Sequence, residues 1–388
     1  MKMNFLYKCR NFIFLLSGSF LEATVIRQVS LSQFLSLYPH VEQMKCSDRI
    51  SVSVPQFPLY KTLEKKYFPS RVSFFPLSII KIPKGMAYFD ATGYTFLNNC
   101  FIKEMQIKHL NFFNNQNACS VAMPSSGIKV PGTVAIVSHL YPYCYGHWIF
   151  DVLGQLALLE MHQIDYDYIC IPYYKKFMKE SLELWGIDSS KIIPLSLQTA
   201  LCADTIVMTT PVTQTDEIIL NANYNVDFIL KYVQSKLLLN LSNSAVSSQF
   251  CKKIFISRKD AGGKRVIPNE DEIFALFEEI GFKRYELSLL SFAQQIALFQ
   301  QAEVVVNFVG SGATNLIFCK PGTMYLEITQ KMVDATFFYV AAMFGIHYYF
   351  INSSTIGDVI KNDIWAKGEV LSIQLVKDFL EKHPEFKK

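Results

Sequence analysis

The stretch that decides the fold is Val304-Val305-Val306-Asn307-Phe308-Val309-Gly310-Ser311-Gly312-Ala313-Thr314-Asn315. Three consecutive β-branched residues predict a fully buried strand, and the small residues after them predict a tight turn into a helix ending near Phe318. Such a turn exposes backbone N–H groups at the positive end of a helix, which favours an anion site. Close packing of a strand on a helix is the alternative, because glycine pairs alone are a weak signal.

Strands and helices alternate on both sides of this stretch. Its own series has further strands at 254–256, 282–287, 324–328 and 348–350, and helices at 269–280, 291–301, 334–344 and 371–382. An earlier series has strands at 133–138, 168–171, 191–195 and 205–208, and helices at 147–161 and 174–184. This alternation predicts an α/β fold with helices covering largely parallel sheets. Two Rossmann-like lobes facing a cleft are the simplest architecture, with ligands beyond the carboxyl ends of the strands.

Changes in composition predict the domain boundaries. Prolines and short β-prone pieces between residues 50 and 130 predict small antiparallel strands, and a Ser- and Asn-rich break at 240–249 separates the two α/β series. We therefore expect a β-rich N-terminal region at 1–130, one lobe at 131–245, a second at 246–365 and a C-terminal helix within 366–388.

Composition excludes several classes of protein. Hydrophobic residues make up 51% of the 388 residues and charged residues 18%, which excludes a disordered chain. The net charge of +4 is too small to indicate a nucleic-acid partner, and no apolar run is long enough for a polytopic membrane protein. The aromatic content of 14% leaves a homo-oligomer open.

Cysteine usage and the N-terminus bear on location. Nine scattered cysteines without a CxxC pair indicate core thiols in a reducing compartment, so we expect a cytoplasmic location, with a membrane-peripheral one as the alternative. Basic residues before the apolar run at 12–16 resemble the first regions of a signal peptide. Because Ser and Gly interrupt that run at 17–19, we expect an ordinary first element. The sequence shows no clustered Cys or His for zinc, so we expect no metal.

A basic loop follows the strand at 254–256. Residues 252–265 contain six basic side chains and one acidic one. Arg258, Lys264 and Arg265 could pair with a diphosphate, with Gly262 and Gly263 letting the backbone approach; a solvated basic turn is the alternative. The glycine turn on a neighbouring strand strengthens the diphosphate interpretation. After the next strand, Glu327 could bind a ribose or be a plain surface carboxylate.

A histidine and an aspartate share one face of the helix predicted at 147–161. His147 and Asp151 are four residues apart, so the pair could remove a proton from an acceptor hydroxyl, although such pairs are more often structural. Trp148 and the tyrosines at 141, 143 and 145 could pack against sugars. His139 is a weaker candidate for the same cleft. The sequence contains neither a GxSxG element nor a P-loop, which argues against a hydrolase elbow and a P-loop NTPase.

Taken in order, these residues resemble glycosyltransferase family 61. The resemblance rests on His147-Trp148 and Asp151, on Ser257-Arg258, Arg265, Asn269-Glu270 and Glu272, on the turn from Gly310 to Asn315, and on Phe318, Pro321-Gly322 and Glu327. It covers roughly residues 80–350, is clearest from 254 to 328, and is closest to microbial members related to xylosyltransferases and O-linked GlcNAc transferases.

The resemblance implies a GT-B fold and an inverting hexosyl- or pentosyltransferase that needs no metal. The substrates would be a nucleotide-sugar, commonly UDP-linked, and a glycan or glycoprotein acceptor. His147 and Asp151 would act on the acceptor. The donor would contact the following residues: Arg258, Lys264, Arg265, Asn269, Gly310, Ser311, Gly312, Thr314, Asn315 and Glu327.

One position departs from the family. Val309 stands where the family usually has a histidine. Either another group replaces that imidazole, or the donor lies differently, or the chain is an inactive relative that binds nucleotide or carbohydrate.

Overall fold

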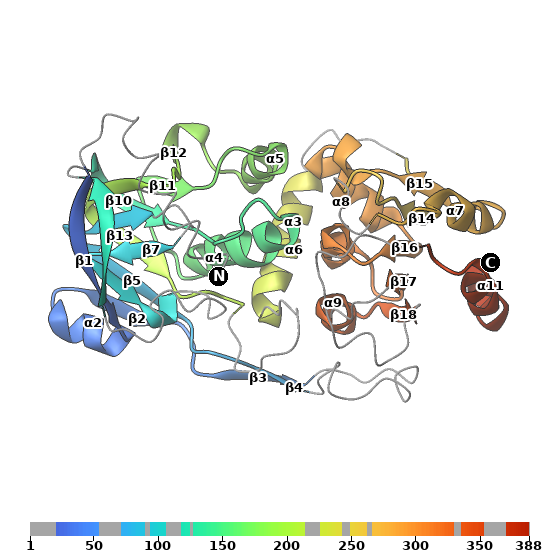
Figure 1. The fold of residues 1–388 in the computed structure, drawn as a ribbon, viewed down its shortest axis with the longest axis horizontal. Coiled ribbons are helices and arrows are strands. Elements are labelled where there is room, and N and C mark those ends of the chain that lie inside the picture. Colours follow the sequence, from blue (N-terminus) through green and yellow to red (C-terminus); the bar gives the residue numbers. More distant parts are fainter. Residues whose placement is uncertain are drawn as a thin grey trace.

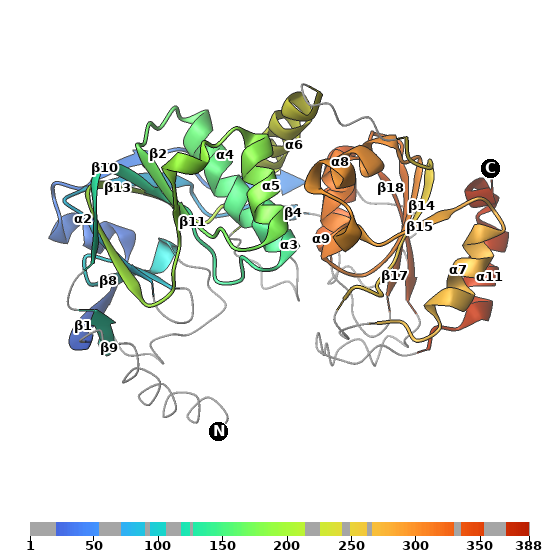
Figure 2. The same ribbon diagram turned by 90° about the horizontal axis from the view of Figure 1, so that it is seen from above.

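The computed structural model describes residues 21–53, 71–89, 94–105, 118–124, 127–213, 226–242, 249–261, 266–329, 335–352 and 370–387. Two sheets, one of eleven strands and one of five, organise these residues and lie side by side along the longest axis (Figure 1). Helices fill the space between the sheets, as the view from above also shows (Figure 2). The predicted α/β class is therefore confirmed.

The five-stranded sheet is entirely parallel, in the order β15-β14-β16-β17-β18. Its strands are β14 (Lys253–Ile256), β15 (Lys283–Tyr285), β16 (Val304–Phe308), β17 (Met324–Thr329) and β18 (His347–Asn352). Every residue of β16 is buried, as its run of valines predicts. Numbered along the chain the order is 2-1-3-4-5, so the winding direction reverses between β14 and β16.

Helices cover both faces of this sheet. On the face toward the larger sheet are α8 (Phe292–Gln301), α9 (Thr336–Phe344) and the 3₁₀ helix η7 (Ser311–Phe318); on the other face are α7 (Glu270–Glu278) and α11 (Ile373–Lys382) (Figure 2). Ser291 and Gln294 form a capping box that starts α8. The predicted helices are present, but the segment after Gly310 forms a 3₁₀ helix.

The larger sheet contains four parallel strands in the order β12-β11-β10-β13. They are β10 (Ile128–Ile136), β11 (Tyr168–Ile171), β12 (Ile192–Pro194) and β13 (Thr199–Thr209). Along the chain this order is 3-2-1-4, which reverses between β10 and β13. Strands from residues 21–124 extend this sheet beyond β13, to which β5 and β6 pair in antiparallel fashion. These strands are β1 (Leu21–Val29), β2 (Glu42–Lys45), β5 (Ser78–Pro83), β6 (Met86–Phe89), β7 (Thr95–Leu97), β8 (Cys100–Ile102) and β9 (Ala118–Pro124).

One long helical run and two further helices pack on the side of the larger sheet that faces the smaller one. The chain from α3 (Tyr145–His147) to α4 (Leu153–Met161) forms one helical run interrupted by a π-helical turn, η4 (Trp148–Val152). Such turns are frequent at functional sites. Beside it lie α5 (Lys176–Trp185) and α6 (Asp227–Ser242). The sequence pattern did not identify α6, which also runs into the start of the predicted break at 240–249.

The remaining elements are one two-stranded sheet and several short helices. The antiparallel strands β3 (Ile50–Ser53) and β4 (Arg71–Phe74) reach α9 on the smaller sheet, where the rings of Phe74 and Tyr339 are 6.5 Å apart.

Among the described residues, no helix combines the length and apolarity needed to cross a membrane. The short helices are α2 (Leu31–Leu37), η3 (Lys103–Met105), η5 (Ser189–Lys191), η6 (Leu287–Leu289) and η8 (Pro384–Lys387).

One hydrophobic core joins the two sheets. Its buried side chains come from α4, α5 and α6 on one side and from η7, α8 and α9 on the other. The ring of Tyr145 lies 5.4 Å from Phe177 and 6.3 Å from Phe292, and Gln234 of α6 donates to the carbonyl of Ile317 at 2.6 Å. Residues at the start of α3 and in η7 therefore meet at a packed interface.

Candidate active site

The winding reversal of the smaller sheet brings the basic loop and the glycine turn together. Arg258 follows β14 and Gly310 follows β16, at the edge where ligands bind in such sheets. A Cβ atom built on Gly310 would lie 2.0 Å from Nη1 of Arg258 and 2.9 Å from its Cζ. The guanidinium group therefore occupies the space that a side chain at position 310 would need, so any larger residue there must displace Arg258.

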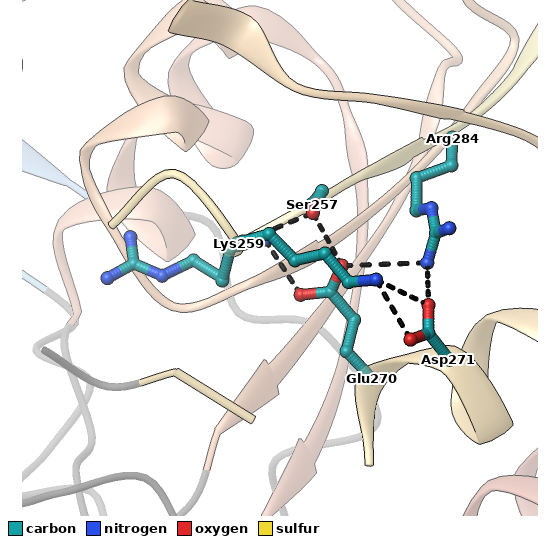
Figure 3. A network of polar contacts seen from close by, with 6 residues as sticks. Ser257, Lys259, Glu270, Asp271 and Arg284 are labelled. Atoms are coloured by element: carbon teal, nitrogen blue, oxygen red, sulfur yellow. Dashed lines mark hydrogen bonds and ion pairs between the residues drawn. The ribbon is translucent and has the colours of Figure 1, made fainter. Parts of the chain in front are cut away.

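The start of the basic loop is held by a buried carboxylate. Glu270 accepts hydrogen bonds from Oγ of Ser257 at 2.5 Å and from the backbone N–H of Arg258 at 2.8 Å. Nearby, Asp271 binds Lys259 Nζ at 2.7 Å and also Arg284 (Figure 3). These two hydrogen bonds, from Lys259 first and then from Arg284, lower the pKa of Asp271. Lys259 is thus engaged by protein, while the Arg258 side chain lies against the glycine turn.

The glycine turn is fixed by its asparagine. Asn315 Nδ2 donates to the carbonyl of Gly312 at 3.1 Å and to Gln295 Oε1 at 3.3 Å, and its Oδ1 accepts from the hydroxyl of Tyr145 at 2.7 Å. A Cβ atom at Gly312 would lie 3.0 Å from Leu287 Cδ1, so packing requires a small residue there. The amide of Asn315 therefore holds the turn and links it to α3, and its predicted contact with a donor stays a prediction.

Two buried polar groups beside the turn have no protein partner. Within the described part of the chain, Oγ1 of Thr314 and Nδ2 of Asn307 make no hydrogen bond, although both residues are at most 1% exposed. Asn307, at the end of β16, was missed by the sequence analysis. A bound polar ligand or water would satisfy such groups. A Cβ atom on Gly146 would lie 3.3 Å from Thr314 Oγ1 and 3.8 Å from Ser311 Cβ, which brings the residue before His147 against this turn.

Two other predicted donor residues use their polar side-chain groups within the protein, and two lie outside the described residues. Glu327 is fully buried and accepts from the hydroxyls of Tyr325, at 3.3 Å, and Tyr348, so the surface-carboxylate alternative is wrong. Asn269 precedes α7, but its side chain pairs with the backbone N–H and carbonyl of Leu371 at 2.9 and 2.8 Å and caps nothing. The predicted contacts Lys264 and Arg265 lie outside the described residues, as do the glycines before them.

The second cluster lies where the larger sheet reverses its winding, between β10 and β13. His139 follows β10, Thr213 follows β13, and the helical run after β10 carries His147 and Asp151. His147 Nδ1 lies 3.0 Å from Asp151 Oδ2, His139 Nε2 lies 3.6 Å from the same oxygen, and the Thr213 hydroxyl donates to Oδ1. The predicted His147–Asp151 pair therefore forms, and it gains two partners from different strands. Thr213 was missed.

Burial and hydrogen bonding determine the protonation of this cluster. Burial alone would raise the pKa of Asp151, but attraction to His139 and the hydrogen bonds from His147 and Thr213 together lower it. Burial lowers the pKa of His139 to about 4, despite the attraction of Asp151. The backbone N–H of Tyr141 donates to His139 Nδ1 at 3.0 Å, so neutral His139 carries its proton on Nε2, facing Asp151.

The same reasoning assigns the tautomer of the catalytic candidate. An ionised Asp151 only accepts hydrogen bonds, so His147 donates through Nδ1, and its Nε2 carries a lone pair when the ring is neutral. The side chain of His147 is 20% exposed, against 2% for Asp151. The ring of His139 stacks on His147 with centroids 4.5 Å apart. Such an arrangement is chemically suited to accepting a proton at His147 Nε2, with Asp151 fixing the orientation of the ring.

The cluster of His139, His147 and Asp151 also has the residue types of a metal site. His139, His147 and Asp151 offer three ligand atoms within 4.8 Å of one another, so the sequence-based argument that no histidines cluster was wrong. Metal-bound histidines normally donate their second ring N–H to an acceptor. Nδ1 of His139 instead accepts from the N–H of Tyr141, so binding a metal through Nε2 would leave neither nitrogen protonated. The donor set therefore fits a proton-transfer network better than a metal ion.

Comparison with known proteins bears on these two clusters. Residues 145–326 match the family model described as Glycosyltransferase 61. The match supports that family. It includes the α3 segment with His147 and Asp151, the loop at Arg258 and the whole glycine turn, and it ends one residue before Glu327. No curated protein matches the chain. The xylosyltransferase-like or O-linked GlcNAc transferase-like subtype stays a prediction.

Proposed function

We propose that this protein is an inverting glycosyltransferase of GT-B type that moves a sugar from a nucleoside diphosphate to the hydroxyl group of a glycan or glycoprotein. The observation that carries the proposal is the contact of Arg258 with Gly310 where the smaller sheet reverses its winding. The His147–Asp151 pair lies where the larger sheet reverses, and Gly146 links the two places by contacting Thr314 and Ser311.

Arg258 and the turn would bind the leaving group. A guanidinium can offer paired donors to a diphosphate, and the backbone N–H groups at the start of η7 point in the direction that favours negative charge. Charge develops on the bridging oxygen as the bond to the anomeric carbon breaks, and fixed positive groups stabilise it without reorganising. Thr314 Oγ1 and Asn307 Nδ2, which have no partner among the described residues, would complete the donor site.

His147 would act as the general base. In this step Nε2 accepts the proton of the acceptor hydroxyl, and the acceptor oxygen attacks the anomeric carbon on the face opposite the diphosphate. The bond from that carbon to the phosphate oxygen breaks, and the nucleoside diphosphate leaves. Asp151 would stabilise the imidazolium that forms, as a carboxylate does behind a catalytic histidine.

The alternative is a relative that binds nucleotide or carbohydrate without turnover, motivated by Val309. The Val309 side chain is buried, and its backbone N–H donates to the carbonyl of Ile328, so it offers no chemical group. The complete network around His147 favours the active enzyme, because it supplies a base at another position.

Calorimetry with UDP and GDP tests the donor site. We expect Arg258→Ala to weaken binding of the preferred nucleotide by roughly 10- to 100-fold, because a charged hydrogen bond contributes about 1.5–3 kcal/mol. Lys252→Ala, at the other end of β14 and paired with Glu303, is the control and should bind normally. Equal affinity of Arg258→Ala and the unchanged protein would refute the assignment.

Nucleotide release from a panel of UDP- and GDP-sugars separates the two functions. Release that depends on His147 supports the transferase. Nucleotide binding without release from any donor supports the inactive relative.

A further inference from the structure

Three tyrosines form an exposed aromatic surface beside the proposed base. Tyr143 and Tyr174 are 54% and 53% exposed, and Tyr141 is 38% exposed. The ring of Tyr141 lies 5.8 Å from that of His147 and 6.2 Å from that of Tyr143, which it meets edge-on. A continuous series of rings therefore leads from His147 to the surface.

Tyr174 belongs to this surface although it comes from another segment. It lies between β11 and α5, and the contact of Tyr145 with Phe177 holds the start of α5 against α3. Partial burial raises the pKa of Tyr174, and the nearby phenol of Tyr143 raises it further. The exposed Tyr143 and Tyr174 are thus carried by two segments that pack together where Tyr145 meets Phe177.

The chemistry of this surface suits a sugar ring. Within the described residues, the hydroxyls of Tyr141, Tyr143 and Tyr174 make no hydrogen bond to protein, so they remain available to sugar hydroxyls. Their flat faces can pack against the C–H groups of a pyranose, since tyrosine combines an apolar ring with a polar tip. Trp148, predicted to share this role, is fully buried and donates to Ser181 Oγ at 2.8 Å, so that prediction was wrong.

We propose that Tyr141, Tyr143 and Tyr174 form the acceptor subsite and that the acceptor is therefore a glycan, bound by its sugar rings, rather than a bare protein side chain. This inference rests on the proposed transferase function. A hydroxyl brought to Nε2 of His147 belongs to a molecule whose next atoms lie over Tyr141, and an adjoining sugar would reach Tyr143 and Tyr174. The tyrosines hold the acceptor, while His147 takes its proton.

Saturation-transfer NMR tests the subsite without requiring turnover. The probes are the methyl β-glycosides of glucose, galactose, xylose and N-acetylglucosamine, titrated into the full chain. We expect at least one glycoside to bind, and Tyr143→Ala and Tyr174→Ala each to weaken it roughly threefold to tenfold, the range of an aromatic contact. Tyr143→Phe keeps the ring and should lose less. Ile128→Ala removes an equally exposed side chain at the opposite end of β10 and should change nothing.

The outcomes separate the inference from the proposed function. Unchanged glycoside affinity in both alanine variants, or no binding of any glycoside, overturns the subsite. A dimer that Tyr143→Ala converts to a monomer would identify the surface as a subunit contact and would also overturn it. Nucleotide release is measured in the same preparations. If the unchanged protein releases nucleotide but both alanine variants keep its glycoside affinity, only the subsite is refuted. If the unchanged protein releases nucleotide from no donor, the transferase proposal is refuted.

Discussion

Replacing Gly310 with alanine isolates the contact on which the donor site depends. The backbone of Gly310 is extended, with φ 162° and ψ 170°, so alanine meets no conformational strain. Its methyl group would, however, start 2.0 Å from Nη1 of Arg258, and ordinary contact begins at 3.4 Å. The guanidinium must therefore move by about 1.4 Å, which a flexible side chain does at little cost to folding.

That displacement is large for ligand binding. A donor 2.9 Å from a phosphate oxygen would be left near 4.3 Å, beyond hydrogen-bonding range. Losing a charged hydrogen bond costs about 1.5–3 kcal/mol, so nucleotide affinity should fall roughly 10- to 100-fold. Both substitutions remove the same hydrogen bond, from Arg258 to the phosphate. The double variant Gly310→Ala/Arg258→Ala should therefore bind nucleotide no worse than Arg258→Ala alone.

Calorimetry with UDP and GDP, together with a thermal melt, measures the two effects separately. Gly310→Ala should melt like the unchanged protein and bind poorly. Gly322→Ala is the opposite control: Gly322 has φ +88° and nothing within 4 Å of a built Cβ, so alanine there should cost about 1 kcal/mol of stability and leave binding intact. Normal nucleotide affinity of Gly310→Ala, or additive losses in the double variant, would refute the role given to Arg258.

Three further predictions concern the surrounding groups. His147→Ala and Asp151→Asn should each reduce turnover by roughly 10²- to 10⁴-fold with nucleotide affinity retained, and wild-type turnover in both would exclude them as the base. His139 has a pKa of about 4 in the folded protein against 6.5 when exposed. The unfolded chain therefore binds the extra proton first, and stability should fall by up to about 3 kcal/mol as pH drops from 6.5 to 4. Melts of His139→Gln should show a flatter pH dependence; an unaltered slope would contradict this origin. Glu270→Ala leaves two buried donors, the Ser257 hydroxyl and the N–H of Arg258, without an acceptor. It should lower the free energy of unfolding by about 2–4 kcal/mol and also weaken UDP binding. An unchanged melting temperature would contradict the structural role of Glu270.

Elements defined by local patterns could be predicted from the sequence. The valine run of β16 and the small residues after it determine a buried strand and a close turn whatever surrounds them. The strands between residues 50 and 130 were expected to be short and antiparallel; β5 and β6 are antiparallel to β13, but β8 pairs with β1 in parallel fashion. Their attachment to β13 was not foreseen, because pairing such as that of Thr209 with Ile79 depends on long-range register. The helix α6 escaped notice because exposed apolar residues such as Phe228 and Leu239 obscure the one-sided spacing of its buried residues.

The same difference between local patterns and long-range contacts decides which site residues could be predicted. His147 and Asp151 could be paired by their spacing, since one helical run carries both. Thr213 is 62 residues from Asp151 in the chain, and only the strand order brings it there. Asn269 has the residue type of a helix cap, but Leu371, 102 residues away, competes for its amide. Glu327 lies on a strand buried on both faces, so its carboxylate is enclosed by tyrosines rather than exposed.

A very short stretch of chain ties the position of the proposed base, His147, to the glycine turn. Tyr145 binds Asn315, Gly146 contacts Thr314, and the next residue is His147. A shift of the turn would therefore move His147 with it, and under the proposed mechanism this packed contact would set the distance between the attacking hydroxyl and the leaving diphosphate. Discrimination among acceptors must then arise outside it, and the exposed rings of Tyr143 and Tyr174 lie on that outer side.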